Sequence, residues 1–268
     1  MEFFSDLIQY GYLSNALAAC VLSGITCGVI GTYVVCRRMV FLAGGITHSS
    51  LGTDPIAGAM IFAVLSALGI EWAGSRGRIR EDSAIGIIWS VGMAVGALFM
   101  SLRPGYTSGD LSAYLFGSIV TVTHSDVAAL TALTLFIIAG ALLWLRPVMY
   151  VAFDRDFARS RGIPTRVISY VMAALIAVTI VLSIRIMGIV LLISLLTMPV
   201  AIVNSLSRSY RTIALCAPLV AVAGNVAGLV ASYNFEVPPG AAIIFTLTLT
   251  LIVVKLLPLR NKKAGAAA

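Results

Sequence analysis

Residues 167–184 (VISYVMAALIAVTIVLSI) and 186–206 (IMGIVLLISLLTMPVAIVNSL) make up one long apolar stretch, in which Arg185 is the one charged residue. A helix needs about 20 mostly apolar residues to cross a bilayer. Each half of the stretch meets that length. The stretch therefore predicts two membrane-spanning helices joined by a tight turn around Arg185.

The composition of the whole chain supports the same interpretation. Of its 268 residues, 60% are hydrophobic and 11% are charged, and the mean hydropathy is +1.02. A soluble domain of this size carries roughly 25% charged residues. The charges are too few to cover a water-facing exterior, so the surface is expected to face lipid.

Hydropathy divides the chain into a series of candidate spans, which predicts an all-α, polytopic transmembrane bundle of about eight or nine helices in a single domain, 1–268. The second candidate is short, at about 15 residues, against the 20 that a span needs. The candidate spans are 12–36, 38–52, 55–72, 83–102, 125–146, 167–185, 186–206, 212–232 and 240–258.

The positive charges cluster between the apolar stretches, and the net charge is +7. The clusters are at 37–38, 76–80, 155–166 and 260–263. Basic loops of this kind mark the cytoplasmic side of a membrane protein. We therefore expect a multi-pass protein of the bacterial cytoplasmic membrane with its N-terminus outside, in contact with lipid and not with nucleic acid.

The hydrophilic segment FDRDFARSRGIP, 153–164, predicts a short cytoplasmic helix. Its acidic residues suit the positive N-terminal end of a helix and its basic residues the C-terminal end, and a glycine and a proline stop it. Phe153 and Phe157 are four residues apart, so we expect them to share one face that docks into a groove of a partner. The residues proposed to act here are Phe153, Asp154, Asp156, Phe157, Arg159, Gly162, Ile163 and Pro164.

Three pairs of glycines four residues apart lie within the candidate spans: Gly24 with Gly28, Gly92 with Gly96, and Gly224 with Gly228. Small residues at this spacing let two helix backbones approach closely. Each pair is therefore a candidate helix-packing contact.

Few side chains in the spans are suited to chemistry. The sequence has no H-E-x-x-H, G-x-S-x-G or P-loop motif, so we expect neither an enzyme nor an ATPase within this chain. His48, preceded by Thr47, is the candidate for contact with a metal ion, because neutral imidazole binds zinc, manganese and iron. A single histidine does not complete a metal site, and a hydrogen bond between helices is the other interpretation.

Four segments resemble, in order, the permease subunits of the zinc, manganese and iron class of ABC importers. They are 153–164, which is similar to that family's coupling helix, 24–39 (GITCGVIGTYVVCRRM), 110–122 (DLSAYLFGSIVTV) and 183–199 (SIRIMGIVLLISLLTMP). The resemblance implies a membrane subunit that pairs as a homodimer and docks on a cytoplasmic ATPase through 153–164. It also implies an extracytoplasmic metal-binding protein as a partner. A divalent zinc, manganese or iron ion is then the substrate, and no cofactor is held permanently.

The chain departs from this family at two places. Many members carry an aspartate four residues before the histidine, where this chain has Gly44. They also continue for roughly eight to ten further residues after the position of Gly52. The first departure removes the carboxylate that would share a helix face with His48. The second agrees with the short length of 38–52, for which a thin or re-entrant element is the other interpretation.

Two alternatives remain open from the sequence. The cargo is a metal chelate rather than a free ion, as Gly44 suggests, or the chain is a secondary transporter that works without an ATPase.

Overall fold

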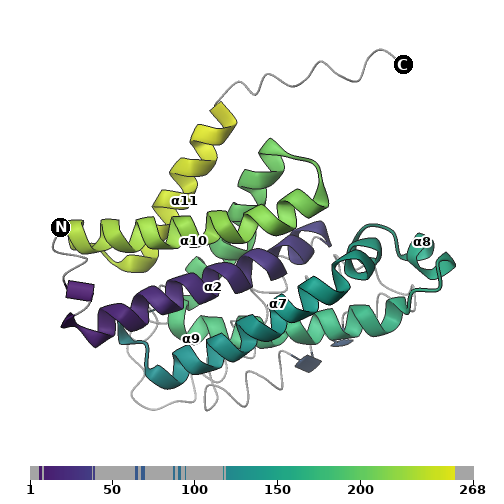
Figure 1. The fold of residues 1–268 in the computed structure, drawn as a ribbon, viewed down its shortest axis with the longest axis horizontal. Helices are drawn as coiled ribbons and strands as arrows, with labels where there is room; N and C mark the ends of the chain where they lie inside the picture. The colour runs from purple at the N-terminus through teal and green to yellow at the C-terminus, as the bar shows by residue number, and fades with distance from the viewer. Residues whose placement is uncertain are drawn as a thin grey trace.

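The computed structural model is a bundle of long helices (Figure 1). It describes residues 6–7, 9–37, 39, 64, 65, 68, 69, 87, 90, 91, 94, 117 and 119–256. The helices in this part of the chain are α2 (Gly11–Cys36), the short 3-10 helix η2 (Ile119–Thr121), α7 (His124–Phe153), α8 (Arg155–Ser160), α9 (Thr165–Leu206), α10 (Tyr210–Phe235) and α11 (Pro239–Leu256).

Six segments within these helices are long and apolar enough to cross a membrane. They include two segments of α9, 165–184 and 186–206, close to the two spans that the sequence predicted. The described residues support six spans and not the predicted eight or nine. Three predicted spans, 38–52, 55–72 and 83–102, lie largely outside the described residues.

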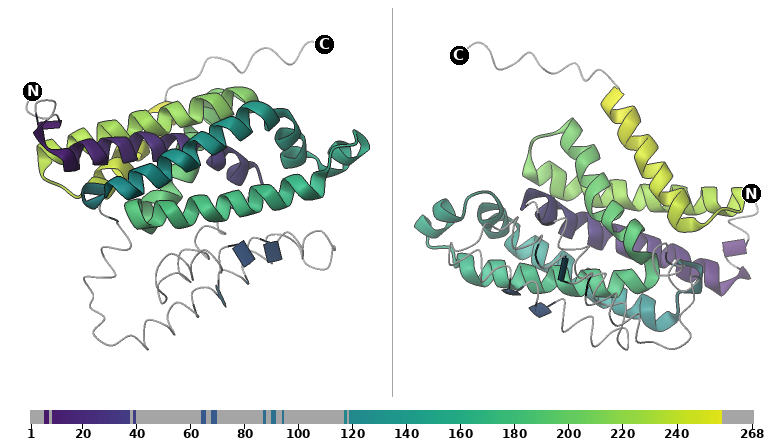
Figure 2. Two further views of the ribbon diagram at one scale, coloured as in Figure 1. Left: turned by 60° about the horizontal axis from the view of Figure 1, so that its bottom comes forward. Right: turned by 180° about the vertical axis from the view of Figure 1, so that it is seen from behind.

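The two halves of α9 meet at Gly188 rather than at Arg185. Gly188 has φ 74° and ψ 171°, a backbone conformation that is essentially restricted to glycine. Gly117 packs on this break, because a methyl group there would lie within 2.1 Å of the Met187 carbonyl carbon. At Gly188 the helix changes direction without a loop, so the two halves of α9 have different axes (Figure 2).

Helix α2 lies at the centre of the bundle and contacts α7, α9 and α10. Gly24 and Gly28 face α10, and a methyl group at Gly28 would lie only 2.4 Å from the Cα atom of Pro218. Gly31 meets the carbonyl oxygen of Leu196 in α9 in the same way. The backbone of α2 thus approaches two neighbours as closely as glycine permits.

The other described glycine pair joins α10 to α11. A methyl group at Gly228 would lie 2.5 Å from the Cα atom of Ile243, and one at Gly224 would meet the side chain of Leu247. The pair Gly92 and Gly96 lies outside the described residues.

Hydrogen bonds inside the spans connect α2 to its neighbours. The Asn225 amide of α10 donates to the carbonyl oxygen of Cys20 at 2.8 Å, and both residues are fully buried. The hydroxyl groups of Thr26 in α2 and Thr134 in α7 are 2.8 Å apart. Such bonds are worth about 0.6–2 kcal/mol each in a bilayer.

We expect Gly28→Val to destabilise the bundle, because the new side chain overlaps the backbone of Pro218. Overpacking of this kind costs about 1–3 kcal/mol. The free energy of unfolding, measured by denaturant titration in mixed micelles, should fall by that amount. Gly140→Val is the matched control, since nothing lies within 4 Å of a methyl group there, and equal stabilities of the two variants would contradict the packing role.

Candidate functional site

The short helix α8 lies between α7 and α9 at one end of the bundle (Figure 1). Asp154 precedes it in an extended conformation and accepts hydrogen bonds from the backbone N–H groups of Asp156, at 3.0 Å, and Phe157, at 2.9 Å. Asp156 adds a second negative charge in the first turn. These features satisfy two of the N–H groups that a helix leaves unpaired and match its positive end.

The C-terminal end of α8 is also closed by specific hydrogen bonds. The N–H of Gly162 donates to the carbonyl of Arg159 at 3.0 Å, and the N–H of Ile163 donates to that of Ala158 at 3.1 Å. Gly162 has φ 74°, as the Schellman motif formed by these two bonds requires. Arg159 and Asp156 form an ion pair at 3.7 Å, but their side chains are 64% and 94% exposed, so it contributes little.

The prediction that Phe153 and Phe157 share one face of a single helix is wrong. The helix is shorter than predicted, because the extended Asp154 separates Phe153, the last residue of α7, from Phe157 in α8. The Phe153 ring meets Tyr210 at 5.5 Å and the Phe157 ring meets Tyr150 at 5.7 Å, both edge to face. The two phenylalanines nevertheless remain 65% and 48% exposed.

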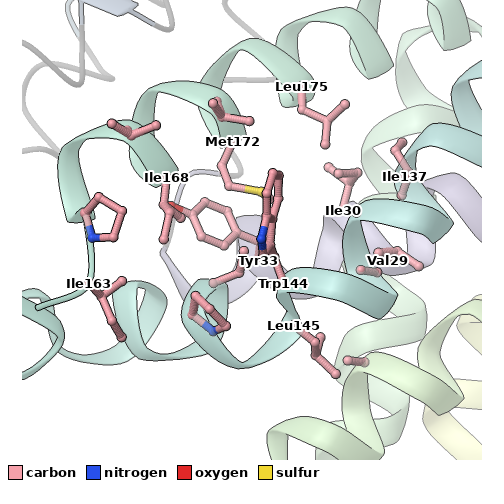
Figure 3. A pocket seen from close by; sticks show the side chains of 18 of the residues that line it. Val29, Ile30, Tyr33, Ile137, Trp144, Leu145, Ile163, Ile168, Met172 and Leu175 are labelled. Carbon is pink, nitrogen blue, oxygen red and sulfur yellow. The ribbon is translucent and has the colours of Figure 1, made fainter. Parts of the chain in front are cut away.

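Buried contacts fix α8 on its neighbours. Ala158 is fully buried, and the Arg155 guanidinium donates to the hydroxyl of Ser169 in α9 at 3.0 Å. Beyond the helix, Ile163 and Pro164 line an apolar cavity beside α7 and α9 (Figure 3). Helix α8 is therefore attached to the spans, while the side chains of Phe153 and Phe157 beside it stay exposed.

The predicted metal-pathway residues, His48 and Thr47, lie outside the described residues, as does Gly44. Within the part of the chain that the structure describes, no three histidine, cysteine or acidic side chains come together to hold a metal ion. His124, the histidine that is described, is exposed at the start of α7, where Thr123 and Asp126 form a capping box.

Comparison with known proteins supplies the family. Residues 9–257 match the model of the ABC 3 transport family. The chain belongs to this family.

Similar proteins and a solved structure support the assignment of this chain to the ABC 3 transport family. It is 32% identical over 251 residues to the manganese transport system membrane protein MntC of Halalkalibacterium halodurans, covering 90% of this chain and 86% of that one. It is 31% identical over 259 residues to a probable metal transport system membrane protein of Treponema pallidum, covering 93% and 96%. Its fold matches a chain of PsaBC from Streptococcus pneumoniae in complex with Fab, with a TM-score of 0.81, 25% identity, and coverage of 96% and 95%.

The family and the six apolar helices confirm a multi-pass transport permease of the bacterial cytoplasmic membrane.

The sequence did not predict the contact of Arg155 with Ser169 or the contacts of the two phenylalanines with tyrosines of other helices. The position of Asp154 three residues before Phe157 was the available signal that the helix begins at 155, because aspartate is a preferred N-cap.

We expect Asp154→Ala to loosen α8, because loss of an N-cap costs about 1 kcal/mol. Amide hydrogen exchange in a peptide covering 153–164, followed by mass spectrometry, should become about fivefold faster. Asp154→Asn is the control and should keep slow exchange, since asparagine caps equally well. An unchanged rate in the alanine variant would show that Asp154 does not hold the helix.

Proposed function

We propose that this chain is the membrane-spanning subunit of an ATP-driven importer of divalent metal ions, and that α8 is the element that docks on a separate cytoplasmic ATPase. The observation that carries the proposal is the short, doubly capped helix that presents Phe157 between two spans. Membership of the ABC 3 transport family supports it.

The geometry of α8 suits docking for two reasons. The exposed side chains of Phe153 and Phe157 offer apolar area to a groove in a partner, as in other helix-in-groove contacts. Its caps order the backbone before binding, which lowers the entropy that association must overcome.

The hydrogen bond between Arg155 and Ser169 connects α8 directly to the first half of α9. Ser169 lies one turn into α9 and is 2% exposed, so a shift of α8 acts directly on a buried position. Motion of the ATPase would then bias the bundle between outward- and inward-facing states, which is a shift between two populations of one helical assembly.

Manganese is the first candidate for the cargo, with zinc and iron next. The relatives named for manganese and metal transport support this order. His48 and Thr47 are the proposed contacts in the pathway, and Gly44 leaves the ion without a nearby carboxylate from the same helix turn. Two copies of His48, one from each subunit of a homodimer, would supply two imidazole ligands.

The remaining parts of the assembly are also proposals. They are the homodimer, the extracytoplasmic metal-binding protein, one permease domain over 1–268, and a full count of eight or nine spans. The span count is supported by the basic clusters at 37–38 and 76–80, because two points on the same side of a membrane are separated by an even number of crossings.

We expect Phe157→Asp to abolish ATP-driven uptake, because a carboxylate cannot enter an apolar groove without a large desolvation cost. Uptake of manganese into proteoliposomes that contain the complex, and copurification of the ATPase, are the measurements. Phe157→Leu keeps an apolar side chain and should retain most of the activity. Normal uptake by the aspartate variant, inserted at wild-type levels, would remove α8 from the docking role.

We expect His48→Ala to reduce metal uptake by at least tenfold if the imidazole contacts the ion. Uptake is measured for manganese, zinc and iron one at a time and for a ferric chelate, with Thr47→Ala as the neighbouring control. Wild-type rate and selectivity in the alanine variant would make His48 structural. Uptake of the chelate alone would replace the free-ion proposal.

A further inference from the structure

An apolar cavity of about 400 Å³ lies beside the turn that follows α8. Its walls come from α2, α7, the first half of α9, the start of α10 and residues 162–164. Tyr33, Trp144 and Met172 point toward one another at its centre (Figure 3). Proline 147 removes a backbone hydrogen bond of α7 and kinks it at Trp144, on the wall of the cavity.

The cavity opens sideways, toward the position of the lipid. Three of its lining side chains are largely exposed: Phe136 at 64%, Trp144 at 60% and Val167 at 60%. All three are apolar or aromatic, and they belong to helices that qualify as spans. An acyl chain is the apolar molecule that a bilayer supplies at such an opening.

The lengths of the helices place one end of the cavity at the level of the headgroups. From Asp126 to Arg146, α7 rises about 30 Å, the thickness of the hydrocarbon core. The residues from Arg166 to Arg185 of α9 rise by nearly the same length. Arg146 and Arg166 therefore lie at one membrane surface, and Trp144 lies where interfacial aromatic residues gather.

Three arginines flank the lining residues in the chain. Arg146 lies between the lining residues Leu145 and Pro147, Arg161 precedes Gly162, and Arg166 precedes Val167. All three are exposed, and none forms an ion pair with another residue in the described part of the chain.

The nearest carboxylates in the chain do not neutralise these arginines. Asp154 accepts the capping bonds of α8, and Asp156 pairs with Arg159. The cavity therefore has an apolar lining, and three exposed arginines that form no ion pair in the described part of the chain are next to its lining residues in the sequence.

We propose that this cavity is a binding site for a phospholipid with an anionic headgroup. One acyl chain enters the cavity, and the headgroup lies against Arg146, Arg161 and Arg166. The cytoplasmic placement of this end rests on the proposed function of α8. A basic pocket between spans on this side is the arrangement that recognises anionic lipids, and each arginine near the surface favours them by about fivefold.

The lipid would connect the docking element to the spans. Its acyl chain contacts the kinked part of α7 and the turn at 162–164 at the same time, so it supports the angle between α8 and the bundle.

Quenching of Trp144 fluorescence by brominated acyl chains tests the proposal. The full-length chain, with Trp72→Phe and Trp89→Phe so that Trp144 is the single reporter, is placed in phosphatidylcholine nanodiscs. A minor fraction of the lipid is brominated phosphatidylglycerol in one arm and brominated phosphatidylcholine, with the same acyl chains, in the other. We expect half-maximal quenching at a mole fraction at least tenfold lower for phosphatidylglycerol.

Two kinds of variant separate the headgroup from the acyl chain. Arg146→Gln with Arg166→Gln should reduce the preference for phosphatidylglycerol by about 25-fold or abolish it, leaving quenching by phosphatidylcholine unchanged. Lys255→Gln, in the last turn of α11 and away from the cavity, is the charge-matched control and should keep the preference. Gly140→Leu points a side chain into open space in the cavity and should reduce quenching by phosphatidylglycerol.

The outcomes decide the proposal without reference to transport. Three outcomes would each overturn it. The first is equal quenching by the two lipids, and the second is a preference for phosphatidylglycerol that survives loss of both arginines. The third is protection of Trp144 from both lipids, as a second copy of the chain would give. The measurement uses neither ATPase nor metal ion. A failure of the proposed docking role of α8 would therefore appear in uptake and not in quenching.

Discussion

The close approach of α2 to α10 is the contact on which the bundle depends. In a bilayer the surroundings of a helix are as apolar as its side chains, so the hydrophobic effect does not drive helices together. Packing at short range and hydrogen bonding must do so. Gly24 and Gly28 allow the approach to Val222 and Pro218, and Asn225 adds a buried bond to the backbone of Cys20. Because α2 also contacts α7 and α9, this arrangement positions the helices that carry α8.

Helix α8 combines a firm attachment with an open edge. A six-residue helix has almost no stability of its own, since nucleation is unfavourable and few bonds repay it. Here the Asp154 cap, the Schellman motif at Gly162 and the buried Ala158 supply what the length lacks. The attachment through Arg155 and Ser169 makes α8 part of the bundle rather than a free connector. An element built in this way can pass a displacement to α9.

Proline 147 and Gly188 introduce two local breaks with different consequences. Proline 147 kinks α7 and accompanies an opening beside Trp144, while Gly188 lets the two halves of α9 diverge at a single residue. The cavity near the first break lies next to the turn that follows α8. The second break packs against Gly117, where a larger residue would collide with the backbone of Met187 and Gly188, while the positive φ of Gly188 itself favours glycine. A proline in α7 and a glycine in α9 therefore each change the course of their own helix.

The sequence by itself determined the class of protein, the positions of the described spans and the family. Apolar length and the spacing of charges are properties of the chain, and a bilayer translates them directly into spans: the predicted 212–232, for example, lies within Tyr210–Phe235. The caps of α8 were also readable, since Asp154, Gly162 and Pro164 act within their own turn. The tertiary structure alone decided which residues meet across helices. It separated Phe153 from Phe157, joined Arg155 to Ser169 and formed the cavity around Trp144. Helix periodicity gives the face on which a side chain lies, but the rotation and approach of each helix follow from packing against its neighbours.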